Sequence, residues 1–147
     1  MTGKSKETKF DFEIFMDNLI TKGKIEKEKE ITPEFKIKLR PLDVDEQIIA
    51  ESVVMANNPY IPYDTVQKIR AISILSKAII SINSIPICKE DTSEKEEEEI
   101  RGKLYKKMMK LPGSIIDDAY NFYFETVLEK KKLYQDGDAL NENIKNF

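Results

Sequence analysis

The chain has 147 residues and a formal net charge of -3, and charged residues make up 35% of it. This length fits one ordinary domain with tails, and the near balance of acid and base argues against a dedicated nucleic-acid binder, for which we expect a basic excess. The absence of His excludes His-based triads and His metal ligands, and the single cysteine, Cys88, cannot form an internal disulfide.

Neither a membrane anchor nor a cofactor motif is expected. The longest apolar stretch, Ala71 to Ile82, contains Lys77 and is too short to cross a bilayer. The glycines are too far apart for a phosphate-binding loop of the Walker or dinucleotide type. The N-terminus is positively charged but lacks the apolar region of a secretion signal, so we expect a cytoplasmic protein without a cofactor.

Residues 1–34 are predicted to form an extension before the core. Within it, segment 10–22 is a short amphipathic element, rich in aromatic residues, that ends near Gly23. Its apolar side chains either pack into the core or present a surface to a partner, and those singled out for a partner are Phe12, Phe15 and Leu19. Residues 24–34 alternate in charge and are either a solvated linker or the first arm of an antiparallel hairpin.

The helical core domain is predicted to span residues 35–134 and to begin with a strand. Apolar and basic residues alternate from Phe35 to Leu39, which is typical of a strand with one solvated face. A capping box formed by Asp43 and Glu46 then opens a helix over residues 44–57. The side chains that this helix is expected to turn toward the core include Val44, Ile48, Ile49 and Val53.

A proline-rich connector leads to the central helix of the predicted domain. Tyr60 and Tyr63 in this connector either cover one end of the core or form a partner-binding edge. The central helix is predicted to open with Asp64 as its N-cap and to continue through Ile82, because large apolar residues recur at every third or fourth position. Its broad apolar surface indicates contacts from two sides.

An acidic run after Cys88 opens the third core helix. Asp91 or Ser93 is expected to cap it, and lysines follow near its C-terminal end. Acid first and base last is the order that the helix dipole favours, so the pattern needs no ligand. A calcium site is the alternative reading, but the run lacks the glycine-turned calcium loop.

The fourth core helix carries most of the aromatic residues. Tyr120 and Phe124 are predicted to face the central helix, which leaves Phe122 and Tyr123 either as a partner-binding patch or as additional core. The polar C-terminal tail, residues 135–147, ends in Phe147 and is either a short recognition peptide or disordered.

These elements predict a mainly α fold, namely a small bundle of four to five helices with a short N-terminal β-strand or hairpin. No catalytic, cofactor-binding or metal-binding residue is predicted. The residues predicted to bind a partner are Phe12, Phe15, Leu19, Tyr60, Tyr63, Phe122, Tyr123 and Phe147.

The order of elements over residues 35–128 resembles small proteins of tailed bacteriophages. The resemblance is carried by a strand that ends in RPL, a helix start DVDE, the segment SKAIISINSIPI, the acidic linker and a last helix that begins LPGSII. These features are similar to those of the tail-assembly chaperones and the baseplate-hub assembly proteins of T4-like phages. Residues 1–34 have no counterpart in this pattern.

The resemblance implies a non-enzymatic component that contacts other phage structural or tail proteins. Such a protein works in the host cytoplasm during assembly, and the virion, in the tail or baseplate, is its alternative location. Neither nucleic acid nor membrane is an expected partner, and a homo-oligomer is a further alternative.

Two other classes of function stay open. A soluble bacterial regulatory adaptor would have the same fold and a different partner. A carboxylate-based or metal-dependent enzyme would gather Asp or Glu side chains with raised pKa values in a cleft. An assembly protein would instead expose apolar side chains, either at Phe12, Phe15 and Leu19 or at Phe122 and Tyr123.

Overall fold

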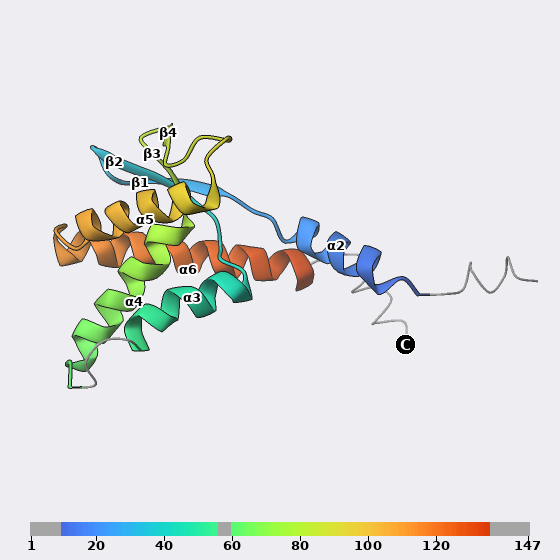
Figure 1. Ribbon diagram of the computed structural model, residues 1–147, viewed down its shortest axis with the longest axis horizontal. Helices are drawn as coiled ribbons and strands as arrows, with labels where there is room; N and C mark the ends of the chain where they lie inside the picture. Colours follow the sequence, from blue (N-terminus) through green and yellow to red (C-terminus); the bar gives the residue numbers. More distant parts are fainter. Residues whose placement is uncertain (1–9, 56–59, 136–147) are drawn as a thin grey trace, which may run out of the picture. The chain divides into compact units, whose positions relative to one another are not determined.

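The computed structural model describes residues 10–55 and 60–135, and these residues form an antiparallel sheet and five helices (Figure 1). The chain divides into two units: the larger unit is Ile25–Glu129, and the described part of the smaller unit is residues 10–24 and 130–135. The elements are α2 (Phe12–Lys22), β1 (Lys27–Thr32), β2 (Phe35–Leu39), α3 (Val44–Met55), α4 (Tyr63–Ala78), β3 (Ile79–Ile82), β4 (Ile85–Pro86), α5 (Glu94–Met108) and α6 (Gly113–Gln135).

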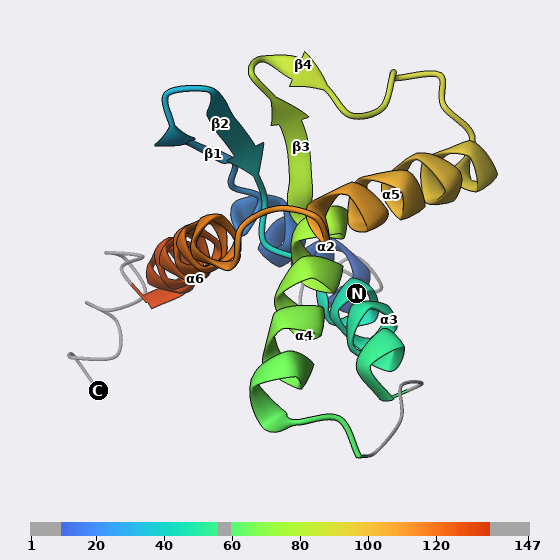
Figure 2. The same cartoon turned by 90° about the vertical axis from the view of Figure 1, so that its left-hand side faces the viewer.

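The fold class is α+β, so the predicted mainly α bundle is wrong. The strands form one four-stranded sheet in the order β1-β2-β3-β4, and each strand is antiparallel to its neighbour. The expected N-terminal hairpin is therefore only half of a sheet whose other half comes from the middle of the chain. Figure 2 shows α4 running directly into β3 without an intervening loop.

The prediction extended the central helix through residues that form β3. Ile79 and Ser81 are buried while Ile80 and Ile82 are half-buried, which is the period-2 pattern of a strand. The next two residues, Asn83 and Ser84, have φ angles of 51° and 67°, and this left-handed pair forms the hairpin turn to β4. β-branched residues favour strands, but an isoleucine-rich run also fits helical spacing, which is why the pattern alone did not separate the two.

The charged segment before β2 is the first arm of a hairpin and not a solvated linker. Lys27 lies opposite Leu39, and Thr32 lies opposite Phe35. Lys and Glu are poor strand formers, but here they form ion pairs with neighbouring elements. The pairs are Lys36 with Glu28 at 3.3 Å, Lys38 with Glu26 at 3.4 Å, and Lys27 with Glu129 of α6 at 2.9 Å.

Both outer strands of the sheet have features that oppose pairing with another chain. The β1 edge is a run of exposed, alternating charges, Lys27 to Glu30. The β4 edge is only two residues long and includes Pro86, which has no N–H to donate. Charges, short strands and proline are the devices by which natural sheets protect their edges.

Local capping signals were predicted correctly at two of three helix starts. Asp43 accepts a bond from Glu46 N at 2.9 Å and Glu46 accepts one from Asp43 N at 3.2 Å, which is the reciprocal capping box at α3. Ser93 accepts a bond from Glu96 N and caps α5. The prediction for Asp64 was wrong, because α4 begins at Tyr63, and its N-cap is Pro62, two residues before the predicted cap, with no side-chain cap bond.

The core of the larger unit joins the sheet to α4, α5 and α6. Leu75 of α4 and Ile79 of β3 are fully buried, and burying a side chain of this size stabilises a fold by about 1.5–3 kcal/mol. Among the buried side chains that form the cluster are Ile37, Leu39, Ala71, Ile72, Ile74, Met108, Ile116, Ala119, Phe122 and Tyr123.

The aromatic face of α6 agrees with the prediction only in part: Tyr120 is half-buried against the core, but Phe124 is not buried, and Phe122 and Tyr123 are additional core. Phe122 and Tyr123 are 6% and 4% exposed, whereas Phe124 is 50% exposed. The Tyr123 hydroxyl also accepts a hydrogen bond from Leu42 N at 3.1 Å. Aromatic residues occupy consecutive positions around this helix, so hydrophobicity alone did not select the buried face; the helical series Ile116, Ala119, Tyr123 and Thr126 does.

The outer face of α3 is apolar and exposed, which also differs from the prediction. Val44 and Ile48 were expected in the core but are 74% and 62% exposed. Instead, fully buried Ala50 lies against α4, where the Ser73 hydroxyl donates a hydrogen bond to the Ala50 carbonyl at 2.7 Å. Because apolar residues occur on several sides of α3, its sequence does not specify one core-facing stripe.

Candidate functional site

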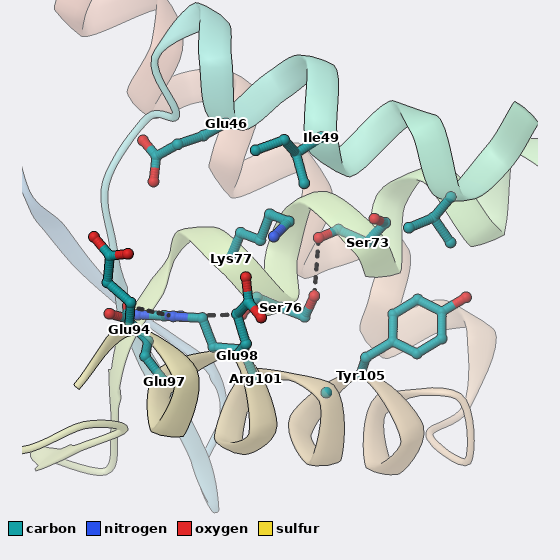
Figure 3. A pocket seen from close by; sticks show the side chains of 12 residues that line it. Glu46, Ile49, Ser73, Ser76, Lys77, Glu94, Glu97, Glu98, Arg101 and Tyr105 are labelled. Carbon is teal, nitrogen blue, oxygen red and sulfur yellow. Dashed lines mark hydrogen bonds and ion pairs between the residues drawn. The ribbon is translucent and has the colours of Figure 1, made fainter. Parts of the chain in front are cut away.

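A groove of about 490 Å³ lies in the larger unit between three helices (Figure 3). Figure 3 shows α3 and α5 on opposite sides of the groove, with α4 between them. The lining residues are Glu46, Ile49 and Val53 of α3, Ser73, Ser76 and Lys77 of α4, and Glu94, Glu97, Glu98, Arg101, Gly102 and Tyr105 of α5.

The groove is acidic at one end and apolar at the other. Figure 3 shows Glu46 and Glu94 at the acidic end and Tyr105 at the opposite end. The α3 wall adds Ile49, which is 56% exposed although it is a large apolar residue. The groove can thus contact a ligand by apolar packing at one end and by charge at the other.

Two of the groove carboxylates are held by arginines. Arg40 donates to both oxygens of Glu46, at 2.8 and 2.5 Å, and this hydrogen-bonded pair lowers the pKa of Glu46 and raises the pKa of Arg40. Arg101 donates to Glu97 at 2.9 Å, and its Nη1 also donates to the carbonyls of Ser76 and Ile79 at 3.0 and 2.9 Å. Arg101 therefore ties the start of α5 to the junction of α4 with β3.

The remaining charges of the groove are available to a ligand. Within the part of the chain that the structure describes, Glu94, Glu98 and Lys77 line the groove and take part in no ion pair. The uncompensated charge of the groove is thus negative. Glu96 and Glu99 are exposed on the same helix outside the lining, next to exposed Lys95.

Gly102 is a glycine in a helix interior that lines the groove. A Cβ atom added to it would meet nothing within 4 Å, so no packing of the described chain requires glycine here. Glycine in a helix interior costs about 0.5–1 kcal/mol relative to alanine. The chain therefore carries a small loss of stability at the one α5 position where the absence of a side chain widens the groove.

A second apolar surface lies on α2, in the smaller unit. Asp11 caps this helix by accepting bonds from Glu13 N and Ile14 N, and none of its residues is buried. Phe12 and Phe15 are 64% and 48% exposed. The apolar residues at spacings of three and four are Phe12, Phe15, Met16, Leu19 and Ile20, which we call the α2 stripe.

The end of α2 packs closely on the end of α6 within the smaller unit. Tyr134 donates a hydrogen bond to the Leu19 carbonyl at 2.6 Å. A Cβ atom at Gly23 would lie 1.8 Å from the Tyr134 hydroxyl oxygen, so any larger residue here would have to displace the end of the Tyr134 side chain. The contact fixes the backbone of α2 and leaves most of its apolar side chains exposed.

The residues predicted to bind a partner fall into different environments. Phe12, Phe15 and Leu19 share the α2 stripe, and Tyr60 and Tyr63 are 90% and 73% exposed near the start of α4. Phe122 and Tyr123 lie in the core and not on the surface. Phe147 lies outside the described residues.

The groove residues were not identified from the sequence. Ile49 was assigned to the core, and no residue of α5 was predicted to bind a partner. Gly102 is the one signal that could have indicated the groove, because a glycine inside a strongly helical segment commonly has a packing or functional reason.

The described residues show neither a candidate metal site nor a candidate membrane span. Among them, no group of three or more His, Cys, Asp or Glu side chains could hold a metal ion, and no helix is both long and apolar enough to cross a bilayer. Glu46 lies in the groove, but its pKa is lowered, which is the opposite of the raised pKa expected for a general acid.

The fold and the surfaces define an α+β protein with a helical groove and a separate amphipathic helix. Comparisons with protein-family models, with curated proteins and with solved structures found no match.

Proposed function

We propose that this protein is a non-enzymatic interaction component of bacteriophage tail or baseplate assembly, acting as a structural subunit or as an assembly chaperone. The observation that carries the proposal is the exposed α2 stripe. Docking of an amphipathic helix into an apolar groove of another protein is a common mode of recognition. The α2 stripe has the spacing that this mode uses.

The physical argument rests on what α2 leaves in water. Phe12 and Phe15, large aromatic residues, are about half to two-thirds exposed on one face of a capped helix. Apolar patches of this kind mark sites of protein association. Glu13, Asp17 and the exposed Ile14 lie outside the stripe, so the aromatic residues of α2 are gathered on the stripe side of the helix.

The phage setting rests on the resemblance of residues 35–128 to tail-assembly chaperones and baseplate-hub assembly proteins. A bacterial regulatory adaptor is the second candidate, because it would use the same exposed helix for a different partner. The two candidates differ in the identity of the protein that α2 binds.

Co-expression of the full chain with each tail and baseplate protein encoded in the same genome tests the proposal. We expect one of them to co-elute with this chain in size-exclusion chromatography. Phe15→Ser removes the centre of the α2 stripe and should abolish co-elution. Ile14→Ser is the matched control, because Ile14 is exposed on α2 but lies off the stripe.

Three results would contradict the proposal. Co-elution that survives Phe15→Ser would show that α2 is not the binding element. Equal loss with Ile14→Ser would indicate a non-specific effect on the helix. Capture of a host regulatory protein in place of all tail and baseplate proteins would favour the adaptor.

A further inference from the structure

We infer that the groove between α3, α4 and α5 binds a short amphipathic helix of a partner protein, with apolar side chains at the Tyr105 end and Lys or Arg at the Glu94 end. This surface is in the larger unit and is separate from the α2 stripe, so the inference goes beyond the proposed function. It assigns the protein a second binding surface with a defined ligand class.

The shape of the groove fits a helix. The α3 wall runs from Glu46 to Val53, about 10 Å of helix axis, and the α5 wall runs from Glu94 to Tyr105, about 16 Å. A ligand helix of about two to three turns matches these walls. The volume of about 490 Å³ is within the range of ligand sites in proteins.

The floor of the groove has no free hydroxyl donor for a ligand, so a ligand contacts it by packing. Ser73 and Ser76 are buried, and both hydroxyls already donate, to the carbonyls of Ala50 and Ser73 respectively. An incoming apolar side chain therefore leaves no floor hydroxyl without a partner. Gly102 in the α5 wall widens the same region, so the axis of a ligand helix can approach closely.

The charge of the groove selects a basic ligand. Arg40 and Arg101 hold two of the four lining carboxylates. The other two, Glu94 and Glu98, have no ion-pair partner among the described residues and outnumber the one unpaired cation of the lining, Lys77. Complementary charge favours the right partner and opposes the wrong one.

A second copy of this chain does not meet that requirement. The charged residues of α2 are Glu13, Asp17 and Lys22, so the helix has a net negative charge. Only Lys22, in the last turn, could pair with Glu94 and Glu98, whereas Glu13 and Asp17 would oppose association, because like charges repel. A more basic helix than α2 fits the groove better, so the proposed occupant is a segment of another protein, and the test below includes a second copy as an outcome.

The test uses two synthetic helical peptides of about four turns, each with Leu at positions i and i+4. In one peptide Arg follows one turn later, and in the control peptide Glu replaces Arg. Binding to the full chain is measured by fluorescence anisotropy. We expect the Arg peptide to bind about tenfold more tightly, and the difference to shrink as salt is added.

Variants locate the binding site. The Glu94→Gln, Glu98→Gln pair should weaken binding of the Arg peptide about three- to tenfold. The Glu96→Gln, Glu99→Gln pair makes the same change of charge on the same helix outside the groove, and should change binding by less than about twofold. Gly102→Ala should weaken binding while raising Tm, which separates obstruction of the groove from damage to the fold.

Any of four results would overturn the inference. These are no binding of the Arg peptide at about 1 mM, equal affinity for the two peptides, equal loss with both pairs of Glu variants, or unchanged affinity in Gly102→Ala. A concentration-dependent increase of mass that Gly102→Ala abolishes would assign the groove to a second copy. None of these results alters the test of the α2 stripe, which is read from co-elution.

Discussion

Replacing Glu46 with Gln tests the connection between β2 and α3. Glu46 accepts two charge-assisted bonds from Arg40, and a third from Asp43 N in the capping box. Glutamine keeps the volume of the side chain and loses its charge. Hydrogen bonds to charged groups contribute about 1.5–3 kcal/mol and exposed ion pairs only about 0.2–1 kcal/mol.

The expected loss lies between these limits. The side chains of Arg40 and Glu46 are 34% and 29% exposed, so solvent screens the pair partly but not fully. We expect Glu46→Gln to lower the free energy of unfolding by about 1–2 kcal/mol at neutral pH.

The loss should depend on pH in a defined direction. Hydrogen bonds from Arg40 hold the pKa of Glu46 below its ordinary value of 4.5. The carboxylate therefore contributes its full stability above the unfolded-state pKa, and that contribution is lost as pH falls through the lower native pKa. Wild type and Glu46→Gln should thus approach equal stability well below pH 4.5.

Urea unfolding followed by circular dichroism, at neutral pH and at low pH, measures both effects. Glu34→Gln serves as the control, because Glu34 is exposed in the β1–β2 turn and its side chain makes no ion pair among the described residues. A change within about 0.5 kcal/mol at neutral pH, which is the range of ordinary surface substitutions, would refute the reasoning. A loss that persists unchanged at low pH would refute the assignment to the carboxylate.

Three further substitutions test the fold. Ser84→Gly should stabilise the protein by about 0.5–1 kcal/mol, because glycine avoids the cost of a left-handed backbone, and an unchanged urea midpoint would contradict this. Tyr123→Phe should cost about 1–3 kcal/mol in urea unfolding, because it leaves the Leu42 N–H buried without its acceptor; a loss under about 0.5 kcal/mol would mean that water replaces the hydroxyl. Gly23→Ala should speed proteolysis within α2, because the Cβ of the new alanine displaces the Tyr134 hydroxyl that holds the end of the helix. An unchanged rate of cleavage would mean that this contact is absent in solution.

Features that depend only on residues close together in the sequence were predictable. The capping box of Asp43 and Glu46 needs only residues three positions apart, and the structure confirms it. The strand Phe35–Leu39 follows from strict alternation. In both cases the determining interactions lie within a few residues of the sequence.

Features decided by distant contacts were not predictable. The run Ile79–Ile82 is a strand because it pairs with β2, whose residues lie about 40 positions earlier, and Ile37 is opposite Ile82. The buried face of α6 is fixed partly by the bond between Tyr123 and Leu42. The spacing of apolar residues around these positions does not indicate either contact.

The two candidate surfaces differ in the same way. The α2 stripe is a property of one helix, so its residues could be named from their spacing. The groove is assembled from α3, α4 and α5, which come from widely separated segments. Only Gly102 carries a local signal, and its meaning depends on what lies opposite it.

The blunted sheet edges restrict how this protein can associate. A strand of another chain cannot readily pair with β1, because the charged residues Lys27 to Glu30 would lose their hydration. It cannot readily pair with β4 either, because Pro86 has no N–H to donate. Fibril growth by strand addition is thereby suppressed even where many copies are crowded together. Partners are therefore expected to bind helical surfaces through side-chain contacts, without hydrogen bonds to the backbone of the sheet.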